Sequence, residues 1–230
     1  MAVLAQYIFG SHARGDFNEG SDIDLLAVVQ EDVFSSFSHG KLNVSFYPRE
    51  RLLEDARKGS LFVMHIVREA VATYDPGNFH ALVVENFLER SNYDHEINNA
   101  SDLGWFLLHQ QSKFKNRDVV NRRISWCIRT ILIALTAEQC EPLFSPHELI
   151  RFANKPYVAS LLSLKSRDTI IADDLNHLKM FLAEFGRPAP AAVLQGDLQR
   201  TWTRFKNSRN SIAIKTVTQM DIDIEDEFYS

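Results

Sequence analysis

The sequence contains little cysteine and no long apolar run. Only Cys127 and Cys140 occur among its 230 residues, so no disulfide framework supports the fold, and we expect two buried thiols in a reducing compartment. No apolar run approaches the ~18 residues that a membrane span requires. No basic segment with a cleavage site follows Met1. These absences argue against a secreted or membrane protein and predict a cytoplasmic one.

The sequence also lacks an excess of positive charge. Its formal net charge is −5, which argues against broad binding to nucleic-acid phosphates, so nucleic acid is open as a partner but not favoured. The basic residues are concentrated in 113–129, which carries six Lys and Arg against one acid, Asp118. Helical spacing places Arg122 and Arg129 on one face. This face is either simply solvated, or one of Arg122, Arg123 and Arg129 grips an anionic group.

The first third of the chain predicts a small mixed sheet. Short apolar or alternating runs bounded by turn residues are typical of strands. The predicted strands are 3–9, 23–29, 42–46 and 70–74. A helix that ends before Gly59 and an apolar helix or turn around 61–66 lie between the last two strands. The Asp-Pro-Gly turn at 75–77 predicts the end of a first domain, 1–76.

The remainder of the chain predicts helices, because apolar residues recur at three- and four-residue spacing. The predicted helices are 79–90, 94–115, 118–139, one that begins at Ser145-Pro146, one from Asp173 or Asp174 to Phe185, and one over 191–211. We therefore predict an α+β fold. A small mixed sheet is followed by an all-helical bundle of five or six helices, 77–215, and by an acidic tail, 216–230.

A Gly-Ser turn follows the first predicted strand, and two aspartates begin the second. Residues i and i+2 of a strand project from the same face, so Asp22 and Asp24 would stand side by side while Ile23 points into the core. Two such carboxylates repel each other unless a cation lies between them, and carboxylate oxygens suit Mg²⁺ first. The turn at Gly10-Ser11 leaves backbone N–H groups free to hold phosphate oxygens. The combination is what nucleotidyl transfer requires.

The segment GSHARGDFNEGSDIDLLAV, residues 10–28, resembles the DNA polymerase β-like nucleotidyltransferase superfamily, whose members carry G-S-x-x-x-G followed by D-x-D. The resemblance covers 3–29 closely and 41–75 more loosely. The helical remainder is similar in general character to the substrate-binding domains of antibiotic-modifying and minimal nucleotidyltransferases. The resemblance implies transfer of a nucleoside monophosphate from an NTP, with ATP expected, to an acceptor hydroxyl, and release of pyrophosphate.

The same resemblance assigns roles to individual residues. Asp22 and Asp24 are the expected catalytic residues and the ligands of Mg²⁺ or Mn²⁺. The expected nucleotide-binding residues are Gly10, Ser11, Arg14, Gly15 and Ser21. The acceptor is open: a small molecule, a protein hydroxyl or an RNA 3′ end would each fit.

The chain departs from the superfamily pattern at the third carboxylate, which members carry on the strand after D-x-D. On 42–46 the apolar residues Leu42, Val44 and Phe46 are expected to face the core, so Asn43 and Ser45 would face the cleft. Asn43 is thus a candidate metal ligand. An amide carries no charge and cannot act as a general base. The site is either a variant that takes its base from elsewhere or a weakened nucleotide-binding module.

A partner-binding function is a further alternative. Some minimal nucleotidyltransferases act like antitoxins that bind or modify a helical toxin, so a small helical protein is a candidate partner. Members usually carry a helix before the first strand, whereas here the strand starts almost at Met1. One side of the small sheet would then be exposed, which favours a partner or a homodimer contact.

Overall fold

The computed structural model describes residues 2–220 and divides the chain into two compact units between Ser91 and Asn92. The first unit contains a five-stranded mixed sheet, and the second is helical. The α+β fold class is therefore confirmed. The acidic residues of the predicted tail, from Asp221 to Glu227, lie outside the described residues.

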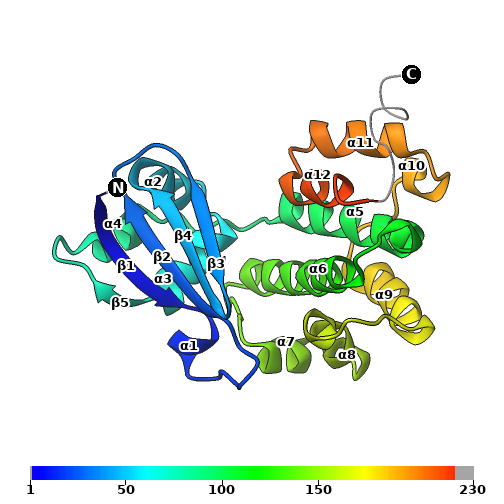
Figure 1. Ribbon diagram of the computed structural model, residues 1–230, viewed down its shortest axis with the longest axis horizontal. Helices are drawn as coiled ribbons and strands as arrows, with labels where there is room; N and C mark the ends of the chain where they lie inside the picture. The colour runs from blue at the N-terminus through cyan, green and yellow to red at the C-terminus, as the bar shows by residue number, and fades with distance from the viewer. Residues whose placement is uncertain (1, 221–230) are drawn as a thin grey trace. The chain divides into compact units, whose positions relative to one another are not determined.

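The sheet has the strand order β3-β4-β2-β1-β5 (Figure 1). Its strands are β1 Val3–Phe9, β2 Ile23–Val29, β3 Ser35–His39, β4 Leu42–Pro48 and β5 Val71–Tyr74. β2 and β4 run parallel, and the other neighbours are antiparallel. Only β3 was not predicted. All five of its residues are exposed. Its backbone pairs with β4, which follows the turn at Gly40, where φ is +58°.

Three helices cover one face of the sheet, behind the strands in Figure 1. They are α2 Arg49–Arg57, α3 Leu61–Glu69 and α4 Phe79–Asn86. Tyr7, Leu26 and Tyr47 from the sheet pack with Leu52 of α2 in the buried core. The core residues of β1, Ala5 and Tyr7, and of β2, Leu26 and Val28, are two positions apart, so they project from the same face of the sheet.

The first unit extends beyond the predicted boundary at residue 76. Phe79 and Val83 of α4 are buried in the same core as the sheet residues, and Leu82 and Phe87 pack against it. The compact unit consequently continues to Ser91. A turn signal marks a change of direction, whereas the boundary depends on which core the following helix joins.

The prediction of which face of β4 is covered was wrong. Tyr47 belongs to the helix-packed core, and strand alternation places Ser45 and Asn43 on the same face as Tyr47. Leu42, Val44 and Phe46 lie on the opposite face and are half-buried. Ile23, expected in the core, is 36% exposed on that opposite face. Both faces of this strand carry apolar residues, so alternation alone does not reveal which one the helices cover.

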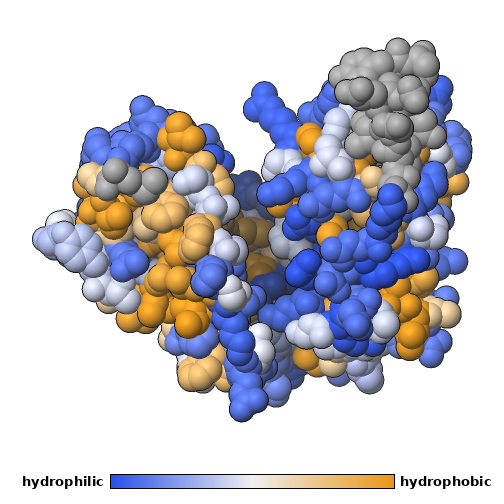
Figure 2. All heavy atoms as spheres, in the orientation of Figure 1, coloured by the Kyte–Doolittle hydropathy of each residue, from blue (hydrophilic) through white to orange (hydrophobic). Residues whose placement is uncertain are grey.

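The uncovered side of the sheet carries exposed apolar side chains. Figure 2 shows apolar residues gathered over the strands of the first unit. Phe37 of β3 is 52% exposed and Ile23 of β2 is 36% exposed, and their strand partners Val44 and Leu42 place both on this side. Single exposed apolar residues are common on protein surfaces, but this set shares one side of one sheet.

The second unit contains eight α-helices among the residues that the structure describes. They are α5 Asp94–Gln110, α6 Arg117–Glu138, α7 Pro146–Ala153, α8 Tyr157–Ser163, α9 Ala172–Phe185, α10 Ala191–Leu194, α11 Leu198–Asn207 and α12 Ser211–Val217. Five or six were predicted. The predicted helix 191–211 is divided at Gly196 and at Arg209, which have φ angles of +69° and +52°, and these angles interrupt a right-handed helix.

The prediction of two buried thiols was wrong for Cys140. Cys127 is buried, whereas Cys140 is exposed, because Cys140 follows the end of α6 in a left-handed conformation, with φ of +61°. Within residues 2–220, no helix combines the length and the apolar character that crossing a membrane would require.

Candidate functional site

The turn between β1 and the short helix α1 Ser11–Arg14 requires glycine at its first position. Gly10 has φ of +75° and ψ of −149°, a combination that is essentially restricted to glycine. A Cβ atom at Gly10 would lie 3.4 Å from Oδ2 of Asp24. Gly15, with φ of +78°, ends α1. The first N–H groups of a helix have no partner within it, so this turn presents backbone donors beside Asp24.

Strand pairing places Asp24 between β1 and β4, at the end of the sheet where the Gly10-Ser11 turn lies. Asp24 is paired with Phe9 of β1 on one side and with Asn43 of β4 on the other. Nδ2 of Asn43 donates a hydrogen bond of 3.2 Å to Oδ1 of Asp24. Asp22, which is exposed, lies two residues before Asp24 at the start of β2 and shares its face by alternation. The structure thus brings Gly10, Asp24 and Asn43 together.

The donor set at this edge fits a divalent cation bound jointly with phosphates. Within the described residues, no group of three or more His, Cys, Asp and Glu side chains lies close enough to hold a metal ion. Mg²⁺ commonly uses only one or two carboxylates and takes its remaining ligands from substrate phosphates and water, and Mn²⁺ accepts the same ligand types. Asn43 presents its N–H group rather than its oxygen to this edge. Asp22 and Asp24 therefore suffice as protein ligands only if phosphate oxygens join them.

The structure places Arg14 against acids of its own unit. Its Nε donates to both carboxylate oxygens of Asp16, at 3.2 Å each. Its Nη1 donates to Oε2 of Glu69 at 2.8 Å and lies 3.5 Å from Nε2 of His65. Both edges of the guanidinium are thus engaged. A direct contact with nucleotide, which the resemblance implies, stays a prediction.

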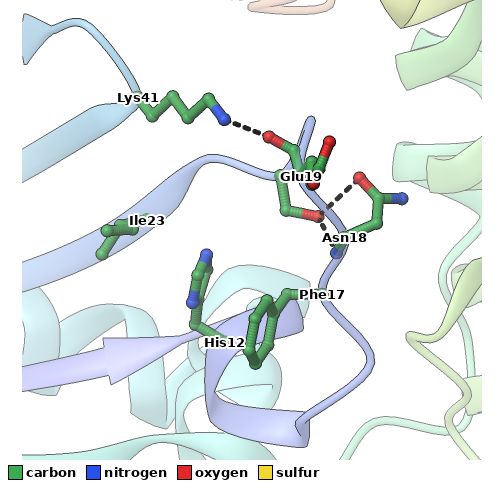
Figure 3. A pocket seen from close by; sticks show the side chains of 7 residues that line it. His12, Phe17, Asn18, Glu19, Ile23 and Lys41 are labelled. Carbon is green, nitrogen blue, oxygen red and sulfur yellow. Dashed lines mark hydrogen bonds between the residues drawn. The ribbon is translucent and has the colours of Figure 1, made fainter.

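A pocket of about 410 Å³ lies beside the turn (Figure 3). This volume is within the range of small-molecule sites, about 300–1,000 Å³. It is lined by His12, Phe17, Asn18, Glu19, Ser21, Ile23 and Lys41. The rings of His12 and Phe17 are stacked, with centroids 4.5 Å apart and planes at 10°.

Several residues that line this pocket form hydrogen bonds with one another. Nζ of Lys41 donates a hydrogen bond to the backbone carbonyl of Glu19. Oγ of Ser21 accepts a 2.9 Å hydrogen bond from the backbone N–H of Asn18. Nε2 of His12 is buried and has no hydrogen-bond partner among the residues that the structure describes. Ser21 therefore shapes the loop that enters β2 and also lines the pocket.

Sequence reasoning missed Phe17, Glu19 and Lys41 as residues of this region. The His12 ring, which also lines the pocket, is half-buried. The G-S-x-x-x-G pattern could have drawn attention to His12, which lies inside it. Lys41 carries no such signal, because the pairing of β4 with β2 brings it to the pocket: the N–H of Ile23 donates a 2.7 Å hydrogen bond to the carbonyl of Lys41.

The arginines predicted to grip an anion lie on α6 of the second unit. Arg122 is exposed, and Arg129 is half-buried. Burial lowers the pKa of the Arg123 guanidinium. Ser125, three residues after Arg122, is buried and donates a 2.9 Å hydrogen bond to the carbonyl of Leu162. The role of these arginines stays a prediction.

Comparison with known proteins identifies the first unit. Residues 3–94 match the model of the family described as "Nucleotidyltransferase domain". No curated protein sequence matches the chain. The crystal structure of a nucleotidyltransferase-like protein from Exiguobacterium sibiricum 255-15 covers 94% of this chain and 85% of its own, with 11% identity and a TM-score of 0.32, too low for an argument. On the strength of the family match, residues 3–94 are a nucleotidyltransferase domain of the polymerase β-like superfamily.

Proposed function

We propose that this chain is a metal-dependent nucleotidyltransferase that transfers a nucleoside monophosphate from an NTP, with ATP the first candidate, to an acceptor hydroxyl. The proposal rests on one observation: the two parts of the sequence motif, G-S-x-x-x-G and D-x-D, lie against each other in the fold. The glycine-specific turn at Gly10 lies against the carboxylate of Asp24, inside a domain that matches the nucleotidyltransferase family. Phosphate donors and carboxylates thus share one edge of the sheet.

The residues at this end of the sheet have separate roles. Backbone N–H groups of the Gly10-Ser11 turn hold the β- and γ-phosphates, and Asp22 and Asp24 hold Mg²⁺ or Mn²⁺. The cation, when bound, neutralises charge on the phosphates and on the departing pyrophosphate. In the reaction the acceptor oxygen forms a bond to the α-phosphorus, the bond from the α-phosphorus to the pyrophosphate oxygen breaks, and the hydroxyl proton passes to solvent water. The helical unit selects the acceptor.

A weakened nucleotide-binding module is the second candidate, and Asn43 favours it. Asn43 occupies the position beside Asp24 where the superfamily pattern has a third carboxylate, and it is hydrogen-bonded to Asp24. It cannot accept the hydroxyl proton. Such a module would bind the metal complex of the nucleotide and release no pyrophosphate.

Incubation with labelled NTPs and Mg²⁺ tests the two candidates against each other. A panel of small-molecule, protein and RNA acceptors is supplied, and pyrophosphate release and label transfer are both measured. Transfer to at least one acceptor, dependent on Mg²⁺ and lost in Asp24→Asn, supports the enzyme. Nucleotide binding without any pyrophosphate release supports the module. Absence of both nucleotide binding and transfer contradicts both candidates.

A further inference from the structure

One face of α3 contacts residues on both sides of the Gly10-Ser11 turn. Phe62, His65 and Glu69 are three and four residues apart in α3, the spacing of a single helix face. Their partners are Phe9, the residue before Gly10, and Arg14, the last residue of α1. The turn is therefore bracketed by a helix that lies more than fifty residues away along the chain.

The entry to the turn is held by aromatic packing. Phe9 lies edge-on to Phe62, with ring centroids 5.9 Å apart and planes at 86°. It meets the ring of His65 in the same way, at 5.5 Å and 88°. Edge-to-face pairs of this kind prefer a defined geometry. Because Phe9 immediately precedes Gly10, these contacts fix where the chain leaves β1.

The exit from the turn is held by charge. Oε2 of Glu69 accepts a 2.8 Å hydrogen bond from Arg14 and also contacts Nε2 of His65. The side chains of Arg14, His65 and Glu69 are only 14%, 15% and 10% exposed. Water therefore screens this ion pair less than a surface pair, and charge-assisted hydrogen bonds are the stronger kind.

The helix α1 needs such support from outside itself. It contains four residues, and a helix of this length is unfavourable in isolation because its first turn costs more entropy than its hydrogen bonds return. Its N-cap residue is Gly10, which has no side chain that could cap the helix. The conformation of Ser11 and of its neighbouring N–H groups therefore depends on contacts made at the two ends of the turn.

We infer that Glu69 and His65 are positioning residues for nucleotide binding, which they support through Arg14 by fixing the Gly10-Ser11 turn. This inference rests on the proposed function, since the ligand of the turn is the nucleotide phosphates. Neither side chain touches the nucleotide in this scheme. Their loss should therefore weaken nucleotide affinity and leave the rate at saturating nucleotide near that of the wild type.

Glu69→Gln tests the inference, with Glu89→Gln as its matched control. Like Glu69, Glu89 pairs with an arginine: its carboxylate lies 3.0 Å from Arg68 of α3. The side chains of Glu89 and Arg68 are 42% and 49% exposed, and neither touches the turn. The dissociation constant of a non-hydrolysable ATP analogue with Mg²⁺ is measured by calorimetry. We expect it to rise about tenfold in Glu69→Gln, as for one charged hydrogen bond, and to stay unchanged in Glu89→Gln. Equal affinities in the two variants would overturn the inference.

A second set of variants keeps the test decisive if Glu69→Gln does not fold. His65→Gln breaks the same network at another point, and we expect it to raise the dissociation constant about threefold with the wild-type fold retained. A rise in KM for the nucleotide without a fall in kcat supports positioning in either variant. A fall in kcat at constant KM would indicate only fewer folded molecules and would overturn it.

A double variant shows whether Glu69 acts through Arg14. If it does, Arg14→Gln combined with Glu69→Gln weakens affinity no more than the worse single variant. Additive losses would contradict the inference, because Arg14 would then contribute independently of Glu69. The wild type separates this outcome from a failure of the proposed function: if it binds no nucleotide, both proposals are wrong, whereas normal wild-type binding with an unaffected Glu69→Gln removes the positioning role alone.

Discussion

Two turns of the first unit follow a strand and open a helix, yet they satisfy their backbone N–H groups in opposite ways. After β5, Oδ1 of Asp75 accepts a 2.7 Å hydrogen bond from the N–H of Phe79, and Oδ2 accepts 3.0 Å and 2.9 Å bonds from the N–H of His80 and the hydroxyl of Tyr7. After β1, the N-cap residue of α1 is Gly10, which has no side chain to accept a hydrogen bond. One turn is closed by the chain's own carboxylate, and in the proposed function the other binds an anion from outside.

The electrostatics of the closed turn agree with a structural role. Burial raises the pKa of Asp75, but the backbone N–H groups of His80 and Phe79 and the Tyr7 hydroxyl lower it further, so its pKa lies below the ordinary value. Burial and the neighbouring Asp75 carboxylate raise the pKa of Tyr7. The comparison teaches that a helix-opening turn stabilises the fold when it is satisfied internally. In the proposed function, the turn at Gly10 binds phosphate instead, and α3 supports it.

The largest expected effect is on chemistry at the open turn. Asp24→Asn removes one of two carboxylates that hold the cation, so we expect Mg²⁺-dependent pyrophosphate release to fall by at least about a hundredfold. The amide oxygen that this substitution introduces can still accept the hydrogen bond that Asn43 donates to Asp24, so the melting temperature should change little. Wild-type turnover in Asp24→Asn would contradict the metal assignment, and a melting temperature lower by many degrees would indicate a structural residue instead.

Gly10→Val should lower nucleotide affinity by about tenfold or more, because its side chain would enter the space beside Asp24 and force an unfavourable backbone. Gly40→Val is the control. Gly40 also has a positive φ, +58°, but nothing lies within 4 Å of its Cβ position. Both variants should lose about 1–2 kcal/mol of stability in chemical denaturation, and only Gly10→Val should lose nucleotide binding in calorimetry. Retained binding in Gly10→Val would move the phosphate site elsewhere.

Asp75→Asn tests the closed turn, where we expect a loss of about 1–2 kcal/mol of stability at neutral pH, as for a helix cap, and no change in nucleotide affinity. The pKa of Asp75 is lower in the folded state than its ordinary value of 3.8. Its contribution is therefore present above about pH 4 and disappears as the pH falls through the folded pKa. Denaturation curves at several pH values should show the two proteins converging below pH 4. A difference that is constant with pH would contradict this assignment.

The smallest expected effect comes from Asn43→Asp. In the metal-free protein this change replaces the hydrogen bond to Asp24 with repulsion, and we expect it to cost about 1 kcal/mol of stability. Mg²⁺ should restore that loss, and metal affinity and turnover should rise because a charged ligand and a base are now present. Ser45→Asp, one step further along the same face, is the control. If neither variant changes the Mg²⁺ dependence or the rate, β4 does not line the metal site.

Much of the fold could be predicted because it depends on short-range patterns. The strands Val3–Phe9 and Ile23–Val29 have the predicted bounds, since a short apolar run between turn residues has few other stable forms. The strand Ser35–His39 could not be predicted, because its polar, exposed residues owe their conformation to pairing with β4. The breaks at Gly196 and Arg209 escaped for the related reason that three short helices have the same apolar spacing as one long one.

The sequence by itself determined the order of the motif: a glycine that allows the turn at residue 10 and two aspartates at the start of the next strand. Backbone sterics and strand alternation act between neighbouring residues, so these features are readable without the fold. Only the tertiary structure decided that Asn43 bonds to Asp24, that Lys41 reaches the pocket, and that Glu69 holds Arg14. These contacts join residues far apart in the chain, and their formation depends on strand register and on which sheet face the helices cover, which local patterns leave undetermined.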